Sequence, residues 1–203
     1  MFFKSLIGFT LLLLLCSVAG AVPTASSMAS APQNQGNAVA DTNTIISHWQ
    51  AAGYTRASLI TSAATKAAVL DYWQNDNSLL RYNNIGHADT PNTNGAPAYG
   101  LNFYNQEVTA TEITNLNPYD GIKYSHVFIN SCNSFENPLH DAILSKSVFN
   151  YVGGVVLLPM YNSEDTAADF WHNYSNLGQS FPTALANAEA GHGTTGMYGV
   201  YGS

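Results

Sequence analysis

Two short runs of consecutive apolar residues constrain the fold of this chain more than any other feature of its sequence. One is Val-Phe-Ile within residues 124–130, and the other is GGVVLLP at residues 153–159. Strands that are apolar on both faces are typical of a parallel sheet that helices cover on both sides. Segments with helical character lie between the candidate strands, which predicts an α/β fold with a mainly parallel sheet flanked by helices.

The expected strands and helices alternate from residue 41 onward. We expect strands at 58–61, 78–85, 101–108, 124–130 and 153–159, the third of them as a hairpin or an edge strand. We expect helices to begin near residues 41, 61, 109, 137, 163 and 182, where Ser, Thr, Asp, Asn or Pro stand at positions typical of helix starts. Residues 87–100 are rich in Asp, Pro, Asn and Gly, which indicates a long loop.

The N-terminus has the layout of a secretory signal peptide. Lys4 precedes an apolar stretch, and the small residues Ala19-Gly20-Ala21 form a cleavage site, so we expect the signal to span 1–21. The alternative is an uncleaved anchor, because residues 6–22 approach the length of a membrane span. No second segment is long and apolar enough for a span. We therefore expect a secreted or cell-surface protein without a membrane span after cleavage.

Residues 22–40 differ in composition from the rest of the chain. They contain Pro, Ser, Gln and Gly without a periodic apolar face, which predicts a flexible linker. The remaining residues, 41–203, have the length of one ordinary domain. The sequence thus predicts a signal peptide, a linker and a single folded domain.

The charge and composition exclude two classes of protein. The 203 residues include 6 Lys and Arg against 13 Asp and Glu, so a cationic surface for nucleic acid is not expected. Hydrophobic residues make up 46% of the chain, which excludes disorder over its whole length. The expected partner is a protein or peptide, and not a nucleic acid.

One histidine and one cysteine directly follow two of the expected strands. His87 follows the strand at 78–85, and Cys132 follows the strand at 124–130. Ligands bind beyond the carboxyl ends of parallel strands, where both side chains would emerge at the same edge. A thiol beside an imidazole can act as a nucleophile whose proton the imidazole accepts. The alternative is that His87 is an ordinary loop residue and Cys132 a small buried hydrophobic residue.

Three sequence blocks resemble caspase-fold cysteine peptidases, in particular the gingipain-type branch. The blocks are YNNIGHADTPNTNG around His87, HVFINSCNSFENPL around Cys132, and the later GGVVLLPMYNSEDTAADFWHNYSNLGQSFPTALANA. The likeness covers roughly residues 41–190. It implies a caspase-like three-layer sandwich for the domain at 41–203.

The resemblance also implies a reaction and its residues. His87 would be the general acid/base, Cys132 the nucleophile, and the backbone amides of Ala88 and Cys132 the oxyanion donors. The chain would be a secreted cysteine endopeptidase that uses a thioester acyl-enzyme and neither a cofactor nor a metal. The alternative is a catalytically inactive caspase-like binding or structural module at the cell surface. Two departures favour it: Ala88 stands where the family usually has Gly, and no strand is evident before residue 41.

Several other acidic and histidine side chains could contribute to a site. Three carboxylates are candidates to line a pocket for a basic substrate side chain, and the sequence does not favour one over the others: Asp89, Asp120 and Glu136. Two groups could contact a metal ion, although such residues are more often solvated helix faces: Glu136 with His140, and Asp165 and Asp169 with His172.

Overall fold

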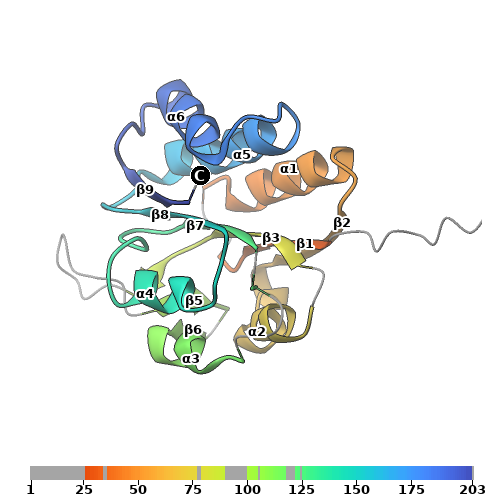
Figure 1. Ribbon diagram of the computed structural model, residues 1–203, viewed down its shortest axis with the longest axis vertical. Coiled ribbons are helices and arrows are strands. Elements are labelled where there is room, and N and C mark those ends of the chain that lie inside the picture. The colour runs from red at the N-terminus through yellow and green to blue at the C-terminus, as the bar shows by residue number, and fades with distance from the viewer. Residues whose placement is uncertain are drawn as a thin grey trace, which may run out of the picture.

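The computed structural model describes residues 26–33, 36–76, 79–89, 100–104, 106–117, 122–123 and 125–202. Its main feature is a six-stranded sheet with the order β2-β1-β3-β7-β8-β9 (Figure 1). Its strands are β1 (Ser26–Ala31), β2 (Thr55–Ile60), β3 (Leu79–Ile85), β7 (His126–Asn130), β8 (Asn150–Gly154) and β9 (Tyr198–Tyr201). All neighbouring strands from β2 to β8 run parallel, and β9 at the edge is antiparallel. The predicted α/β fold with a mainly parallel sheet is confirmed.

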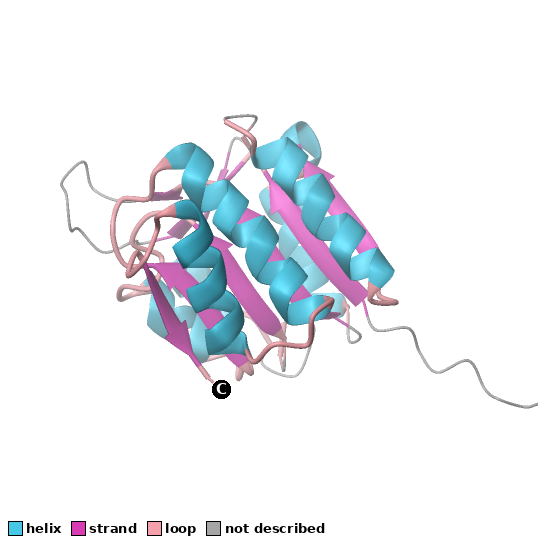
Figure 2. Ribbon diagram, turned by 90° about the horizontal axis from the view of Figure 1, so that it is seen from above, coloured by secondary structure: helices cyan, strands magenta, loops and turns pink. Residues whose placement is uncertain are grey.

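Helices cover both faces of this sheet, which makes a three-layer sandwich. One face carries α1 (Ala38–Ala51), α5 (Met160–Ser175) and α6 (Phe181–His192), and Figure 2 looks onto this side. The other face carries α2 (Lys66–Asn75), α3 (Ala110–Asn115) and α4 (Leu139–Leu144) (Figure 1). A 3-10 turn, η1 (Thr61–Ala63), precedes α2.

A second, smaller sheet lies beside the α2–α4 layer. It consists of β4 (Ala88–Asp89), β5 (Gly100–Phe103) and β6 (Gln106–Thr109), paired in antiparallel order. The hairpin expected at 101–108 is confirmed by the pairing of β5 with β6. Ten residues of the long loop expected at 87–100, residues 90–99, lie outside the described residues.

The central strand β7 explains why an apolar run predicts this architecture. Val127 and Ile129 belong to the hydrophobic core under α2 and α4, and Phe128 belongs to the core under α1, α5 and α6. Successive side chains of a strand point to opposite faces, so consecutive apolar residues of this strand pack into both cores. The apolar run at 124–130 is thus a strand buried on both faces, as predicted.

The prediction of a flexible linker at 22–40 is wrong. Ser26–Ala31 form β1 in the middle of the sheet, and α1 begins at Ala38 instead of near 41. The strand is made of Ser, Ala and Met, which lack the β-branched and aromatic side chains that mark most strands. Its serine hydroxyls bond to neighbouring strands, as Ser27 Oγ does when it donates to the Thr55 carbonyl at 3.0 Å. Pairing on both sides therefore replaces the usual hydrophobic signal.

The apolar run at 153–159 is a strand for only two of its residues. β8 spans Asn150–Gly154, so the run leaves the sheet after Gly154 and continues to the start of α5. A Cβ atom on Gly154 would lie 2.6 Å from the Ser131 carbonyl oxygen, so close approach of the backbones explains the glycine there. The consequence is that Val155 to Leu158 follow the carboxyl end of the sheet.

The predicted signal peptide at 1–21 lies outside the described residues. Among the residues that are described, no helix combines the length and the apolarity that crossing a membrane would require.

Candidate active site

The structure brings the ends of β3 and β7 together. The two strands are adjacent and parallel, with Ile85 opposite Asn130 in the register. His87 lies two residues after Ile85, and Cys132 lies two residues after Asn130. Both side chains therefore leave the same edge of the sheet from neighbouring strands, as the sequence predicts.

His87 and Cys132 line one cavity of about 100 Å³. The opposite wall is made by the segment that follows β8 and by the first turns of α5, including Leu158, Met160 and Glu164. A concave site with a nucleophile, an imidazole and a carboxyl group is an arrangement expected of an enzyme site. The structure thus places the two sequence-predicted residues in a single pocket.

Cys132 is partly exposed and forms no disulfide. The Leu158 backbone N–H points at its sulfur, with 3.3 Å between Leu158 N and Cys132 Sγ. A backbone donor stabilises negative charge on the atom that it faces. The chain then turns sharply, because Asn133 has a φ of 50°, a left-handed conformation that Asn tolerates better than most residues.

A chain of hydrogen bonds joins the residue before His87 to the residue before Cys132. Ser131 Oγ donates to the Gly86 carbonyl at 2.9 Å, and Asn84 Nδ2 donates to Ser131 Oγ at 3.4 Å. Ser30 Oγ in turn donates to Asn84 Oδ1 at 2.8 Å. These three side chains come from β1, β3 and the end of β7. The hydrogen bonds between them therefore fix the ends of β3 and β7 relative to each other.

Substitution Ser131→Ala should weaken the reactivity of Cys132 without unfolding the protein. The variant loses one buried hydrogen bond, about 1 kcal/mol, and frees the Gly86 carbonyl next to His87. Because small misplacements of catalytic groups cost about 10²-fold in rate, we expect the second-order rate constant for labelling of Cys132 by an acyl electrophile to fall about 10- to 100-fold. Ser47→Ala is the matched control, since Ser47 Oγ also donates to a backbone carbonyl, on the exposed face of α1. Equal labelling rates in both variants would contradict this role.

Glu164 is a buried carboxyl group in the wall of the cavity, and sequence reasoning missed it. Only 5% of its surface is exposed, and its Oε2 accepts a hydrogen bond from the Asn37 backbone N–H at 2.6 Å. Burial raises the pKa of Glu164 to about 7, with a smaller contribution from nearby Asp41 and Asp165, while the Asn37 hydrogen bond opposes the rise. The one feature of the sequence that could have indicated Glu164 is its position just after the loop that follows β8.

Of the three acids proposed from the sequence, the structure describes the side chain of Glu136 alone. Asp120 and the side chain of Asp89 lie outside the described residues, and Glu136 is exposed and does not line the cavity. Among the residues that the structure describes, Glu164 is the acidic residue that lines the cavity.

Glu164→Gln should make the protein more stable at pH 8 but not at pH 5. A carboxyl whose folded pKa is about 7, against 4.5 as the ordinary value, contributes stability below pH 4.5 that is lost as the pH rises through 7. The glutamine keeps an oxygen that can accept the Asn37 N–H and has no proton to lose. At about 1.4 kcal/mol per pKa unit, we expect the variant to gain about 2–3 kcal/mol in free energy of unfolding at pH 8.

Urea unfolding between pH 5 and pH 8 measures this effect, with Glu136→Gln on the surface as the control. A smaller slope should remain in the Glu164 variant, because burial also raises the pKa of Asp41 to about 6. Parallel stability curves for wild type and Glu164→Gln would contradict the assignment.

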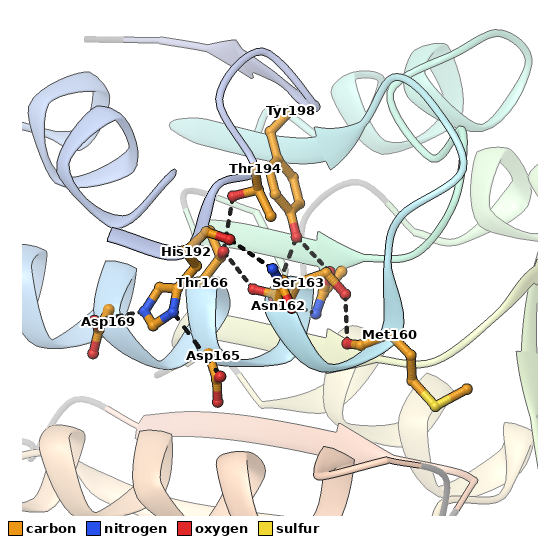
Figure 3. Close-up of polar contacts among 10 residues, drawn as sticks. Met160, Asn162, Ser163, Asp165, Thr166, Asp169, His192, Thr194 and Tyr198 are labelled. Carbon is orange, nitrogen blue, oxygen red and sulfur yellow. Dashed lines mark hydrogen bonds and ion pairs between the residues drawn. The ribbon is translucent and has the colours of Figure 1, made fainter. Parts of the chain in front are cut away.

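Polar contacts with α6 and β9 hold the first half of α5 in place (Figure 3). His192 Nε2 lies 2.8 Å from Asp169 Oδ2, its Nδ1 lies 3.9 Å from Asp165 Oδ2, and its carbonyl accepts from Asn162 Nδ2 at 2.8 Å. Tyr198 OH, from β9, donates to the Ser163 carbonyl of α5 at 3.2 Å. The cavity wall formed by α5 is thus braced by the C-terminal part of the chain.

The candidate metal group of Asp165, Asp169 and His172 is not assembled. Figure 3 shows the two carboxylates beside the ring of His192, and His172 packs instead against the ring of His48, with 4.8 Å between centroids. Within the part of the chain that the structure describes, no three His, Cys, Asp or Glu side chains form a group suited to a metal ion.

Ala88, the predicted source of one oxyanion amide, lies in β4 opposite Leu101. Among the described residues other than glycine, a positive φ occurs at Thr61, Asn133 and Ser147, and not at Ala88. The turn after His87 therefore does not require the glycine that the family usually has there.

Solved structures of cysteine proteinases have the same fold. The Arg-specific cysteine proteinase gingipain R matches 89% of this chain with a TM-score of 0.67 and 12% identity. The complex of pro- and mature domains of Porphyromonas gingivalis RgpB matches 89% of this chain, with a TM-score of 0.66 and 12% identity. The Saccharomyces cerevisiae separase–securin complex matches 87% of this chain, with a TM-score of 0.58 and 13% identity.

These likenesses confirm the caspase-like fold, and at such low identity they show the fold alone. The chain spans 46% and 47% of the two gingipain chains and 12% of the separase chain. No protein-family model matches the sequence, and no curated protein matches it.

Proposed function

We propose that this chain is a cysteine endopeptidase that hydrolyses peptide bonds through a dyad of Cys132 and His87. The observation that carries the proposal is that these two side chains follow adjacent parallel strands and line one cavity. The shared fold with gingipain R and separase supports it. The signal-like layout of residues 1–21 supports action outside the cytoplasm.

The first half of the reaction forms an acyl-enzyme. His87 accepts the thiol proton, and Cys132 Sγ bonds to the scissile carbonyl carbon. The backbone amides of Ala88 and Cys132 hold the negative oxygen that results. The carbonyl then re-forms, the C–N bond breaks, and His87 gives its proton to the departing amine, which leaves a thioester.

The second half releases the acid and restores the thiol. His87 accepts a proton from water while the water oxygen bonds to the thioester carbonyl carbon. The C–S bond breaks, the sulfur takes the proton back from His87, and the new carboxylic acid leaves. No cofactor enters this sequence of steps.

Glu164 supports a basic residue on the acyl side of the cleaved bond. The carboxyl group lines the cavity that also contains Cys132, and a cationic side chain there would favour its ionised form by lowering the pKa that burial raises to about 7. Gingipain R, which shares the fold, is Arg-specific. Peptides that differ only by Arg, norleucine or Asp at that residue test the assignment, with Arg expected to be cleaved fastest.

Labelling with a thiol-directed acyl electrophile tests the dyad. Prompt modification of Cys132 that disappears in His87→Ala is the expected result, because the imidazole must accept the thiol proton. His140→Ala is the control, since His140 on α4 packs against Phe135 and does not line the cavity. Equal, slow labelling of the wild type and the His87 variant would refute a working pair.

The alternative, an inactive caspase-like module, has lost one of its two supports. The first core strand exists as β1, so the fold lacks nothing at that position. The remaining support is Ala88 in place of Gly. The same labelling experiment separates the two functions, because an inactive module has no reason to keep His87-dependent reactivity at Cys132.

A further inference from the structure

A buried arginine lies near the amino-terminal ends of the strands, away from the candidate active site at their carboxyl ends. Only 7% of Arg81 in β3 is exposed, and its Nε and Nη1 atoms have no hydrogen-bond partner in the described part of the chain. No carboxylate among the described residues forms an ion pair with it. The ring centroids of Tyr54 and Tyr174 lie 3.8 Å and 5.2 Å from its Cζ. Aromatic rings therefore stand where a buried cation usually has a carboxylate partner.

His126 lies beside this arginine, and its contacts suit a neutral imidazole. The two residues are opposite each other in the register of β3 and β7. The Asn150 side-chain nitrogen lies 3.0 Å from His126 Nδ1, and the Tyr174 hydroxyl oxygen lies 3.1 Å from His126 Nε2. A neutral ring accepts at the first nitrogen and donates from the second, whereas a second proton on Nδ1 would face the donating amide. Burial and then the charge of Arg81 lower the pKa of His126 to about 4.

Aromatic side chains from the corner between α5 and α6 cover the ring of His126. Its centroid lies 5.2 Å from that of Tyr174, near the end of α5, and 5.8 Å from that of Phe181, at the start of α6. The hydrogen bonds and ion pairs of His126 within the described residues include no Asp or Glu side chain. The charged group that faces the ring is Arg81, so a proton on His126 would place two cations together under the corner.

Other titratable groups face α5 and have different effects. The rings of His48 and His172 lie 4.8 Å apart near the same end of the helix, and burial, followed by the charge of His172, lowers the pKa of His48. Near the start of α5, burial raises the pKa of Glu164 to about 7 and that of Asp41 to about 6. These two carboxyl groups favour the folded state as the pH falls, so they do not loosen the helix in acid.

We propose that His126 and Arg81 form an acid-sensitive latch, which holds the α5–α6 corner (residues 174–181) on the sheet while His126 is neutral and releases it when His126 takes up a proton. Below the ordinary pKa of 6.5 the open state binds a proton that the closed state does not bind until about pH 4. Opening therefore becomes more favourable as the pH falls through this range. About three turns of α5 separate Tyr174 from Glu164 in the cavity wall, so the released corner loosens the helix that carries the wall.

Amide hydrogen exchange of the full chain at pH 6.5 and pH 4.5 tests the latch, with rates corrected for the intrinsic effect of pH on exchange. Release of the corner frays the last turn of α5, whose carbonyls accept from the amides of Asn176, Leu177 and Gln179. We expect the protection of these amides to fall about 10- to 100-fold between the two pH values, because opening takes up about one proton. The readout is structural and does not depend on the proposed peptidase function.

His126→Gln removes the titration but keeps the contacts, because its amide can accept from Asn150 and donate to Tyr174. We expect this variant to lose less than about 3-fold in protection over the same range. Arg81→Met is a second variant that lacks the opposing charge, and its loss should be smaller than that of the wild type. His140→Gln is the matched control, because His140 packs against Phe135 in the other helix layer, and it should behave as the wild type.

Three results would overturn the latch. One is an equal loss of protection in the wild type and in His126→Gln. Another is a loss that persists in His126→Gln and disappears in His48→Gln, because the titrating group would then be the pair of His48 and His172. The third is a loss of the same size in β7 and β8, because acid would then unfold the whole domain and not the corner.

Discussion

Replacing His87 by Ala should lower kcat/KM for peptide hydrolysis by about 10²- to 10⁴-fold, and Cys132→Ala should lower it to the uncatalysed rate. In the proposed mechanism the imidazole accepts the thiol proton and returns it to the leaving amine, so its loss would affect acylation at two points. The thiol would form the covalent bond itself, and no other cysteine among the described residues could replace it. The measurement is steady-state hydrolysis of an Arg-containing peptide by purified protein.

Residual activity separates a catalytic pair from a contaminating protease. The double variant should be no slower than Cys132→Ala alone, because residues that act as a unit have non-additive effects. His140→Ala should retain most of the wild-type rate. Equal residual hydrolysis in His87→Ala, Cys132→Ala and the wild type would place the activity outside this chain.

The candidate pair was predictable because its signal is local. His87 follows the strand that ends at Ile85, and Cys132 follows the apolar run of β7, so the sequence alone places both at the carboxyl edge of a parallel sheet. The register Ile85 to Asn130 confirms that these strands are neighbours. The rule that sites lie beyond the carboxyl ends of parallel strands then needs no further information.

The strand β1 was not predictable, because its stability comes from its neighbours. Small serine and alanine side chains have no strong preference for a strand. They form one here because β2 and β3 pair with both edges, and because Ser30 finds acceptors and donors in Asn84 and Tyr82. The partners are more than 50 residues away in the sequence, where local patterns give no information.

Glu164 and the exposed residues after β8 escaped prediction for a related reason. The run GGVVLLP predicts a buried strand, and the strand ends instead at Gly154, so that Val156 and Leu157 are exposed. The burial of Glu164 depends on Asn37, which lies 127 residues earlier in the chain. The pKa of about 7 arises from this burial in the folded protein, so the sequence alone could not indicate it.

Polar residues inside β3 show how the core resolves an apparent conflict. Arg81, Asn83 and Asn84 interrupt the apolar pattern of the strand, yet all three are buried. Arg81 lies over the ring of Tyr54, with 3.8 Å from its Cζ to the ring centroid, and Asn83 Oδ1 accepts the Trp171 indole N–H at 2.9 Å. Arg81 and Asn83 thus each have an aromatic partner, whereas Asn84 bonds to Ser30 and Ser131. The hydrogen bond between Asn83 and Trp171 joins helix α5 to the sheet.

Trp171→Ala should lower the free energy of unfolding by about 3–5 kcal/mol, which is a large part of the stability of an ordinary domain. The side chain is fully buried, and its ring packs edge-on against Trp49 at 5.0 Å between centroids. Its removal leaves a cavity between sheet and helix and takes the hydrogen bond from Asn83, whose Nδ2 has no hydrogen-bond partner in the described part of the chain.

Trp171→Phe helps to separate the two contributions, because it keeps an aromatic ring, although a smaller one, and loses the indole N–H. We expect about 1–3 kcal/mol of destabilisation for this variant from the unsatisfied Asn83 oxygen and the smaller ring. Denaturant unfolding followed by circular dichroism measures both variants. A loss below 1 kcal/mol for Trp171→Ala would contradict the packing, because a ring that contributes so little could not hold α5, and with it the cavity wall at Glu164, against the sheet.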